Sequence, residues 1–232
     1  MTSRLAKLIV HDARLQRRYH IYAAYAVVVG LYMAVFHFAG DALPVWVVAV
    51  VIASDPSVLG FFFLGGLMLL EKAEMARMAL AMTPVSAGDY LIAKTVTLTA
   101  IALVAVTLLG IVSPHPLNWP LYLGSVALVS IEFVGIGAAF ALRFRTVTGY
   151  LIGAGVLLLP AVLPGGFAFL DPMPVWAAAL PFAAPLKLML LSLGAGTASF
   201  FDIAVMLAAS LAYAAGGFFW GVAALSRELG RK

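Results

Sequence analysis

The sequence contains no cysteine, and charged residues make up only 10% of its 232 residues. Without cysteine the chain has no disulfide scaffold, no thiolate nucleophile and no cysteine metal ligand. Hydrophobic residues make up 64% of the chain, well above the about 45–50% of soluble domains, which also carry about 25% charged residues. This composition predicts an integral membrane protein with an all-α fold.

Motifs for enzyme chemistry are also missing. The sequence has no GxxxxGK[ST] phosphate loop, no HExxH metal motif and no GxSxG nucleophile elbow, which mark ATPases, metalloproteases and serine hydrolases. The histidines lie at the ends of apolar runs, at positions His11, His20, His37 and His115. We therefore expect a chain with no catalytic residue, no metal site and no cofactor of its own.

The apolar runs predict six transmembrane helices, because each is close to the about 20 residues that cross a bilayer. Together with the segment 1–18, they form a single transmembrane domain over residues 1–232. The chain has 14 basic residues, and all except Lys187 lie at the termini or in alternate connections. Since basic connections stay on the cytoplasmic side, both termini are predicted to be cytoplasmic. The predicted spans are 20–39, 46–70, 89–112, 119–142, 147–169 and 200–225.

The N-terminal segment has apolar and basic residues on opposite faces of a helix. Leu5 and Ile9 share one face, whereas Lys7 and Arg14 share the other. This pattern predicts an amphipathic helix on the cytoplasmic membrane surface, with its basic groups toward anionic lipid headgroups. The alternative is a basic tail that only sets the topology. Asp12 falls within the apolar face, so we expect it to pair with a cytoplasmic arginine.

The connection 170–199 is long and still apolar, so an ordinary solvated loop does not explain it. We expect a pair of short re-entrant helices on the outer side, before the sixth span, because irregular backbone at membrane depth must be covered by protein. The residues that prevent a full span are Pro172, Pro174, Pro181 and Pro185.

The connection 72–86 is a polar island in the apolar chain. Glu71 closes the second span, and residues 75–82 place methionines at helical spacing, which predicts a short helix with a methionine-rich stripe. Ser86 and Asp89 have the spacing of a capping box at the start of the third span. A helix of about ten residues is marginal in water, so another surface must cover the stripe. That surface is either a partner or the helix's own bundle.

Two carboxylates lie deep in apolar runs. At about 1.5 Å per residue, Asp55 in the second span and Glu132 in the fourth both fall near the middle of the bilayer. A charged carboxylate there costs at least a few kcal/mol, so each is expected to be paired, protonated or next to a wet cavity. Both are candidates for contacting cargo. The alternatives are that Asp55 caps a helix broken at Pro56 and that Glu132 bonds to a neighbouring helix.

The island and its surroundings resemble the type-2 ABC exporter permeases. Those proteins have a Glu at the end of the second span, a short helix, a Thr-Pro and a Lys early in the third span, which correspond here to Glu71, residues 75–82, Thr83-Pro84 and Lys94. The stretches LGFFFLGGLMLLEK and TPVSAGDYLIAK most resemble the fluoroquinolone export permeases of actinobacterial type. One departure is EKAEMARM, where many relatives carry a Gly after the second acidic residue.

The resemblance implies a permease subunit of an ATP-driven exporter in the bacterial cytoplasmic membrane. It implies a drug-like amphipathic cargo, as in multidrug efflux and antibiotic resistance. ATP and Mg²⁺ would be bound by a separate P-loop ATPase subunit, and a second permease subunit, identical or paralogous, would complete the assembly. No nucleic-acid partner is expected. Lipid, sodium, peptide or haem-related cargo stays open, as does an ATP-independent carrier, although the sequence has no inverted repeat.

In such an exporter the connection 72–86 is a coupling loop, through which ATPase movement reaches the spans. Close helix packing would help to transmit it, and two GxxxG pairs permit such packing, although these pairs are frequent in membrane helices. They are Gly149 with Gly153 and Gly217 with Gly221. The residues assigned to ATPase coupling are Glu71, Glu74, Met75, Met78, Ala79, Met82, Thr83 and Pro84.

Overall fold

A computed structural model of the chain describes residues 2–74, 85–228 and 230. This described part is built of helices and their connections, with no β-strand. It contains five helices long and apolar enough to cross a membrane, and a bent helix pair makes a sixth crossing possible. The predicted all-α membrane fold is therefore confirmed.

The helices follow the predicted spans closely, with shifts of a few residues at their ends. In chain order the first elements are α1 (Thr2–Arg18), α2 (Ile21–Ala39), the 3₁₀ turn η1 (Gly40–Ala42), α3 (Val45–Val58), the π-helical segment η2 (Leu59–Phe63) and α4 (Leu64–Ala73). They are followed by α6 (Ala87–Val112), α7 (Trp119–Ala141), α8 (Val147–Val162) and the 3₁₀ segments η3 (Leu163–Phe169) and η4 (Val175–Ala179). The last two are α9 (Ala183–Ser192) and α10 (Phe200–Glu228).

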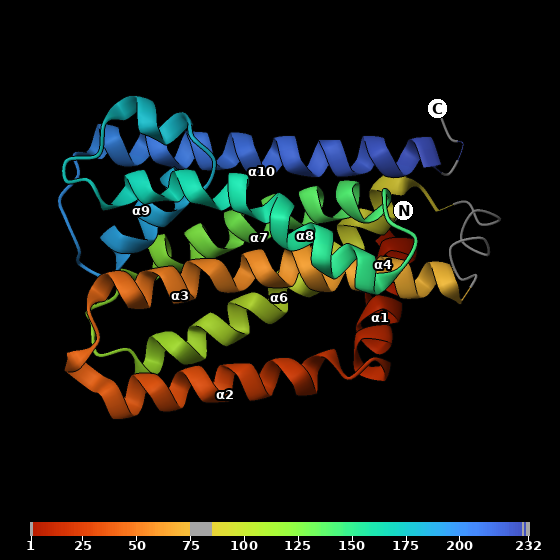
Figure 1. Cartoon of the computed structure of the whole chain (residues 1–232), viewed down its shortest axis with the longest axis horizontal. Helices are drawn as coiled ribbons and strands as arrows, with labels where there is room; N and C mark the ends of the chain where they lie inside the picture. The colour runs from red at the N-terminus through yellow and green to blue at the C-terminus, as the bar shows by residue number, and fades with distance from the viewer. Residues whose placement is uncertain (1, 75–84, 229, 231–232) are drawn as a thin grey trace.

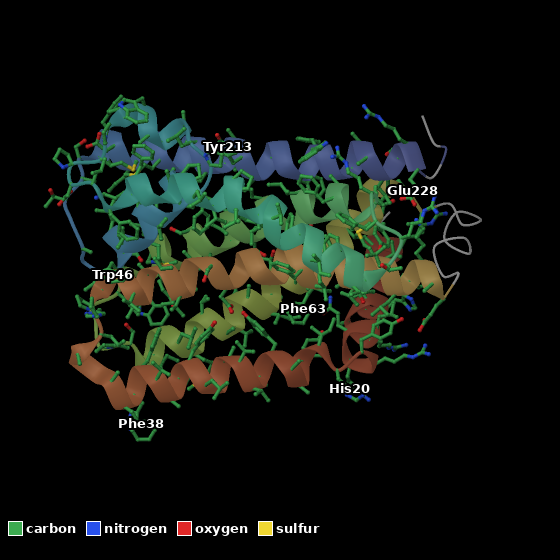
Figure 2. All side chains as sticks on the ribbon, viewed as in Figure 1. His20, Phe38, Trp46, Phe63, Tyr213 and Glu228 are labelled. Carbon is green, nitrogen blue, oxygen red and sulfur yellow. The ribbon has the colours of Figure 1, made fainter. Side chains whose placement is uncertain are left out.

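The long helices form one bundle, and α1 lies crosswise at one end of it (Figure 1). Both termini lie at this same end, as do the end of α4 and the start of α6. Helix α7 is central, since it packs against α3, α4, α6, α9 and α10. Its large side chains Tyr122 and Phe133 are fully buried. Figure 2 shows Trp46 and Phe38 toward the opposite end of the bundle from Glu228, and Phe38 points outward.

Glycines bring α7 and α10 into backbone contact. A Cβ atom added at Gly217 would lie 2.7 Å from the carbonyl oxygen of Glu132, and one at Gly221 would lie 2.7 Å from that of Gly135. Such approaches are closer than any side chain permits, so α10 lies directly against α7 at this point. The other pair differs, because the nearest atoms to Cβ positions at Gly149 and Gly153 belong to the adjacent connection, at Thr146 and Phe144.

The second span runs as a helix from Val45 to Ala73. The helix is not broken at Pro56, because α3 continues to Val58 and then widens into the π-helical segment η2. In a π segment the backbone hydrogen bonds join residues five apart instead of four, so the regular α-helical pattern is interrupted there. The Tyr150 hydroxyl of α8 donates to the carbonyl oxygen of Phe61 within this segment. The irregular backbone is therefore held from the neighbouring helix.

The fifth span is bent where the sequence predicts a continuous helix over 147–169. Residues Val147–Val156 and Leu158–Phe169 form an angle of 41°. Pro160 explains the position of the bend, because a proline ring inside a helix clashes with the carbonyl group four residues earlier, here that of Val156. The chain then continues as the 3₁₀ segment η3.

The outer connection 170–199 contains the short 3₁₀ segment η4 and one short helix, α9, where the sequence predicts a helix pair. Helix α9 is covered by α7 and α10. Its Lys187 side chain is buried and donates to the carbonyl oxygen of Leu170 at 2.8 Å, with Asp171 3.4 Å away. Residues 182–193 of the connection are thus folded onto the bundle and largely covered by protein, whereas residues 170–172, 175 and 176 are exposed.

Candidate functional site

A buried ion cluster lies at the end of the bundle that holds the termini. The Lys94 ammonium of α6 forms an ion pair with Asp12 of α1 and a second one with Glu71 of α4, at 2.6 Å from Glu71 Oε1. These three side chains are only 2%, 6% and 3% exposed. One cation therefore joins three helices that are distant in the sequence.

Neutral donors bind the remaining oxygen atoms of the two carboxylates. The Tyr90 hydroxyl donates to Glu71 Oε2 at 2.6 Å, and Gln16 Nε2 donates to Asp12 Oδ2 at 2.7 Å. The Thr97 hydroxyl lies within hydrogen-bond distance of the same Asp12 oxygen. Two carboxylates with one ammonium carry an excess negative charge, and these hydrogen bonds stabilise it.

The cluster forms because its members recur at helical spacing. Asp12 and Gln16 are four residues apart on α1, whereas Tyr90, Lys94 and Thr97 follow one face of α6. These intervals place each set on the side of its helix that faces the other. Removing one member of such a buried pair leaves an uncompensated charge, which costs about 3–5 kcal/mol.

The start of α6 is fixed by the predicted capping box, which is confirmed. The Asp89 amide donates to Ser86 Oγ at 3.0 Å, and the Ser86 amide donates to Asp89 Oδ2 at 3.3 Å. These two bonds satisfy amide groups that a helix start otherwise leaves unpaired. The cap therefore sets the helical register that places Tyr90 and Lys94 in the cluster.

The ion cluster joins the two helices that flank the connection 72–86, to which the sequence assigns coupling and which is called the coupling segment below. Glu71 lies two residues before the end of α4, and Tyr90 and Lys94 lie in the first two turns of α6. The residues between α4 and α6 thus connect two helices that are joined to each other and to α1. Of the residues assigned to coupling, Glu71 and Glu74 are described, whereas Met75, Met78, Ala79, Met82, Thr83 and Pro84 lie outside the described residues.

Glu74 and Lys72 extend these contacts to neighbouring elements. Glu74 caps the end of α4. Burial raises the pKa of the Tyr19 hydroxyl above its usual value, and the Glu74 carboxylate raises it further. Lys72 Nζ lies 3.7 Å from Glu228 Oε1 at the end of α10. Figure 2 shows Glu228 at the same end of the bundle as His20, which precedes α2.

The expected partner of Asp12 was wrong. The sequence suggests a cytoplasmic arginine, but the structure pairs Asp12 with Lys94. Arg14 and Arg17 are both exposed. The sequence contains a signal for the correct pairing, because a lysine inside an apolar span needs a carboxylate partner. Sequence reasoning also missed Gln16, Tyr90 and Thr97, whose neutral side chains carry no such signal.

The two candidate cargo carboxylates are both buried, at 5% exposure for Asp55 and 2% for Glu132. Asp55 lies within the helical turns of α3, and its Oδ2 atom has no hydrogen-bond partner among the described residues. Glu132 lies on α7 where Gly217 of α10 makes its closest approach. No hydrogen bond joins the described side chains of Asp55 and Glu132 to each other.

The helices and the ion cluster define an all-α, multi-pass membrane protein with three elements joined at one end. No family model matches the chain. The chain is 34% identical over 147 residues to the fluoroquinolones export permease proteins of Mycobacterium tuberculosis strains CDC 1551 / Oshkosh and ATCC 25618 / H37Rv. The match covers 60% of this chain and 60% of the length of each of these curated relatives. This similarity confirms the resemblance to fluoroquinolone export permeases.

Proposed function

We propose that this chain is the permease subunit of an ATP-driven exporter whose cargo is an amphipathic, drug-like compound. The observation that carries the proposal is the ion cluster, which joins α1, α4 and α6 where the chain enters and leaves the coupling segment. The similarity to proteins named as fluoroquinolone export permeases supports the class of cargo. The presence of several helices long and apolar enough to cross a bilayer supports a role within the membrane.

In this proposal a separate P-loop ATPase binds ATP and Mg²⁺ and contacts the methionine stripe of residues 75–82. A rigid-body movement of the ATPase displaces the coupling segment. Because Lys94 joins Glu71 to Asp12, that displacement is shared by α4, α6 and α1. Helix α1 would thus move together with α4 and α6, so the displacement would involve three helices and not only the loop.

The proposal places the chain in a bacterial cytoplasmic membrane with both termini in the cytoplasm. The distribution of basic residues supports this orientation, and both termini lie at the end of the bundle where the coupling segment begins (Figure 1). A second permease subunit, identical or paralogous, would complete the path. Asp55 and Glu132 are the proposed contacts for a cationic group on the cargo, since little water screens a charge at their depth.

The proposal is tested by purifying the chain from cells that also express a P-loop ATPase subunit of the same organism. We expect a stable complex that hydrolyses ATP and a chain that hydrolyses none alone. Inverted membrane vesicles with both proteins should take up a fluoroquinolone when ATP is added. Uptake that needs no ATPase, driven instead by an ion gradient, would show an ATP-independent carrier.

A further inference from the structure

A pocket of about 580 Å³ lies at the end of the bundle opposite the termini, between the start of α3, the end of η3 and α9. We call it the Trp46 pocket. Sites for drug-sized molecules have volumes of about 300–1,000 Å³, so this pocket is large enough for such a ligand. Most of its wall is apolar, but the described residues that line it include two charged ones, Asp171 and Lys187. The pocket is thus separate from the ion cluster, which lies at the other end of the bundle.

Two aromatic side chains form part of the pocket wall. Trp46 is the second residue of α3 and Phe169 is the last residue of η3, and their rings lie 6.3 Å apart at an angle of 88°. They are 55% and 46% exposed, so much of their surface is open to a ligand. The face of an aromatic ring attracts a cation placed within about 6 Å of its centre, and tryptophan attracts it most strongly.

The Asp171 carboxylate lines the same pocket and has one oxygen atom without a partner. Its Oδ1 atom lies 3.4 Å from Lys187 Nζ, whereas its Oδ2 atom accepts no hydrogen bond from the described residues. A charge-assisted bond is normally about 2.7–2.9 Å long, so Lys187 compensates this carboxylate only in part. The Asp171 side chain is 45% exposed and is therefore accessible to a ligand.

Lys187 holds Asp171 in place and is itself largely hidden from the pocket. Its side chain is 4% exposed, and its ammonium donates to the carbonyl oxygen of Leu170 at 2.8 Å. A second acid, Asp202, lines a smaller pocket together with Lys187 and accepts from the Ser199 hydroxyl at 2.7 Å. The accessible charge of the Trp46 pocket is therefore that of the Asp171 carboxylate.

The surrounding end of the molecule is negatively charged. Its connections and the first turn of α10 contain three acids and one base, which gives a net charge of −2 with histidine neutral. The acids are Asp41, Asp171 and Asp202, and the base is Lys187. A net charge of one sign around a pocket with apolar walls raises the local concentration of ions of the opposite sign. Cations are therefore favoured at this end of the bundle.

We infer that the Trp46 pocket binds an amphipathic organic cation, that is, an apolar body with a positively charged group. The positive group lies between the Asp171 carboxylate and the Trp46 ring, and the apolar body lies against Phe169 and Leu190. A metal ion needs several oxygen ligands, and this pocket is mostly apolar. A zwitterionic lipid headgroup fits less well, because its phosphate would lie beside Asp171. The inference rests on the proposed function only in identifying this cation with the exported cargo.

Two ions of similar size and shape but opposite charge test the inference. They are tetraphenylphosphonium and tetraphenylborate. The measurement is equilibrium dialysis of each ion against the purified chain in neutral detergent, with protein-free detergent as the blank. We expect one saturable site that prefers tetraphenylphosphonium by at least about 10-fold, because a carboxylate attracts the one ion and repels the other. Equal binding of the two ions would overturn the inference.

A pair of acid variants locates the charge that the cation contacts. Asp171→Asn should weaken binding of tetraphenylphosphonium by at least about 5-fold, without weakening that of tetraphenylborate. Asp202→Asn is the matched control, since it removes the same charge from the same end of the bundle outside the Trp46 pocket, and an amide oxygen can still accept from Ser199. It should leave the affinity unchanged. The same loss in both variants would mean that the ion responds only to the general charge of this surface.

A pair of tryptophan variants tests the aromatic wall without changing any charge. Trp46→Leu should weaken binding of tetraphenylphosphonium by about 2- to 5-fold. Trp176→Leu is the control, because Trp176 is 59% exposed and packs against Phe167, and neither residue lines the pocket. These variants leave the pair of Lys187 and Asp171 intact, so they test the site even if Asp171→Asn disturbs the fold. Equal affinities of the two tryptophan variants would contradict the inference.

Two further measurements identify a different site or a different occupant. If Asp55→Asn abolishes binding while Asp171→Asn does not change it, the cation is bound at the middle of the bilayer and the inference is wrong. If binding is lost when phosphatidylcholine nanodiscs replace the detergent, a lipid headgroup occupies the pocket, and the inference is again wrong. All these measurements use the chain without an ATPase. Their failure would leave the proposed export activity standing, and failure of export in vesicles would leave this binding site standing.

Discussion

Replacement of Lys94 by methionine should strongly destabilise the end of the bundle where α1, α4 and α6 meet. Methionine keeps much of the length of the side chain but removes the ammonium group. Lys94 is 2% exposed and pairs with Asp12 and Glu71, which are 6% and 3% exposed. Both carboxylates would stay buried without their cation, and breaking a buried pair in this way costs about 3–5 kcal/mol.

Thermal unfolding of the purified chain in detergent measures this cost. A change of 1 kcal/mol shifts Tm by about 2–4 °C in a chain of about this length, so Tm should fall by roughly 10 °C. Lys72→Met is the matched control, because Lys72 lies at the same end but is 42% exposed and 3.7 Å from Glu228. Exposed pairs of this kind contribute only about 0–1 kcal/mol. Equal Tm values for the two variants would refute the reasoning.

A rescue variant separates the charge from the packing. In the triple variant Lys94→Met with Asp12→Asn and Glu71→Gln, the buried charges are removed together, and amide groups can still accept from Tyr90. We expect this variant to recover most of the lost Tm, since replacing a complete buried ion network by neutral groups is often close to neutral. If the triple variant is as unstable as Lys94→Met, the loss comes from the lysine's own packing.

Three further predictions concern packing, coupling and cargo. Gly217→Ala should destabilise the chain by at least about 1–3 kcal/mol, because its Cβ would press on the carbonyl oxygen of Glu132. Gly216→Ala should not destabilise the chain, because its Cβ meets nothing within 4 Å. Chemical unfolding of both variants measures the difference in stability. Met78→Asp should abolish copurification with the ATPase while the permease still inserts, because it would bury a charge in an apolar contact; unchanged association and transport would show that the stripe packs on its own bundle. Asp55→Asn and Glu132→Gln should reduce export of a cationic compound more than of its neutral analogue in inverted vesicles, and equal effects on both compounds would assign these acids to structure.

The membrane fold was predictable from the sequence because a bilayer imposes local rules. A span needs about 20 apolar residues whose backbone groups bond within the same helix, so each span is visible as a continuous run. The capping box at Ser86 and Asp89 is local in the same sense, since both partners lie within one turn. The amphipathic N-terminal helix is likewise defined by the spacing of its own residues.

Contacts between distant segments were decided by the tertiary structure alone. Lys94 and Asp12 are 82 residues apart, and the packing angle of α1 against α6 determines that they meet. The two GxxxG pairs look alike in the sequence, yet Gly217 and Gly221 contact α7 whereas Gly149 and Gly153 face their own connection. Side-chain spacing identifies a helix face, but not the helix that covers it.

The sequence by itself thus determined the medium, the spans and the residues that need a partner. It indicated that Asp12, within the apolar face of its helix, needs a partner. Only the tertiary structure decided that Asp12 and Lys94 satisfy each other and that Glu71 shares the same cation. The physical reason is that the cost of an unpaired polar group depends on its own burial, whereas its partner is chosen by how whole helices pack.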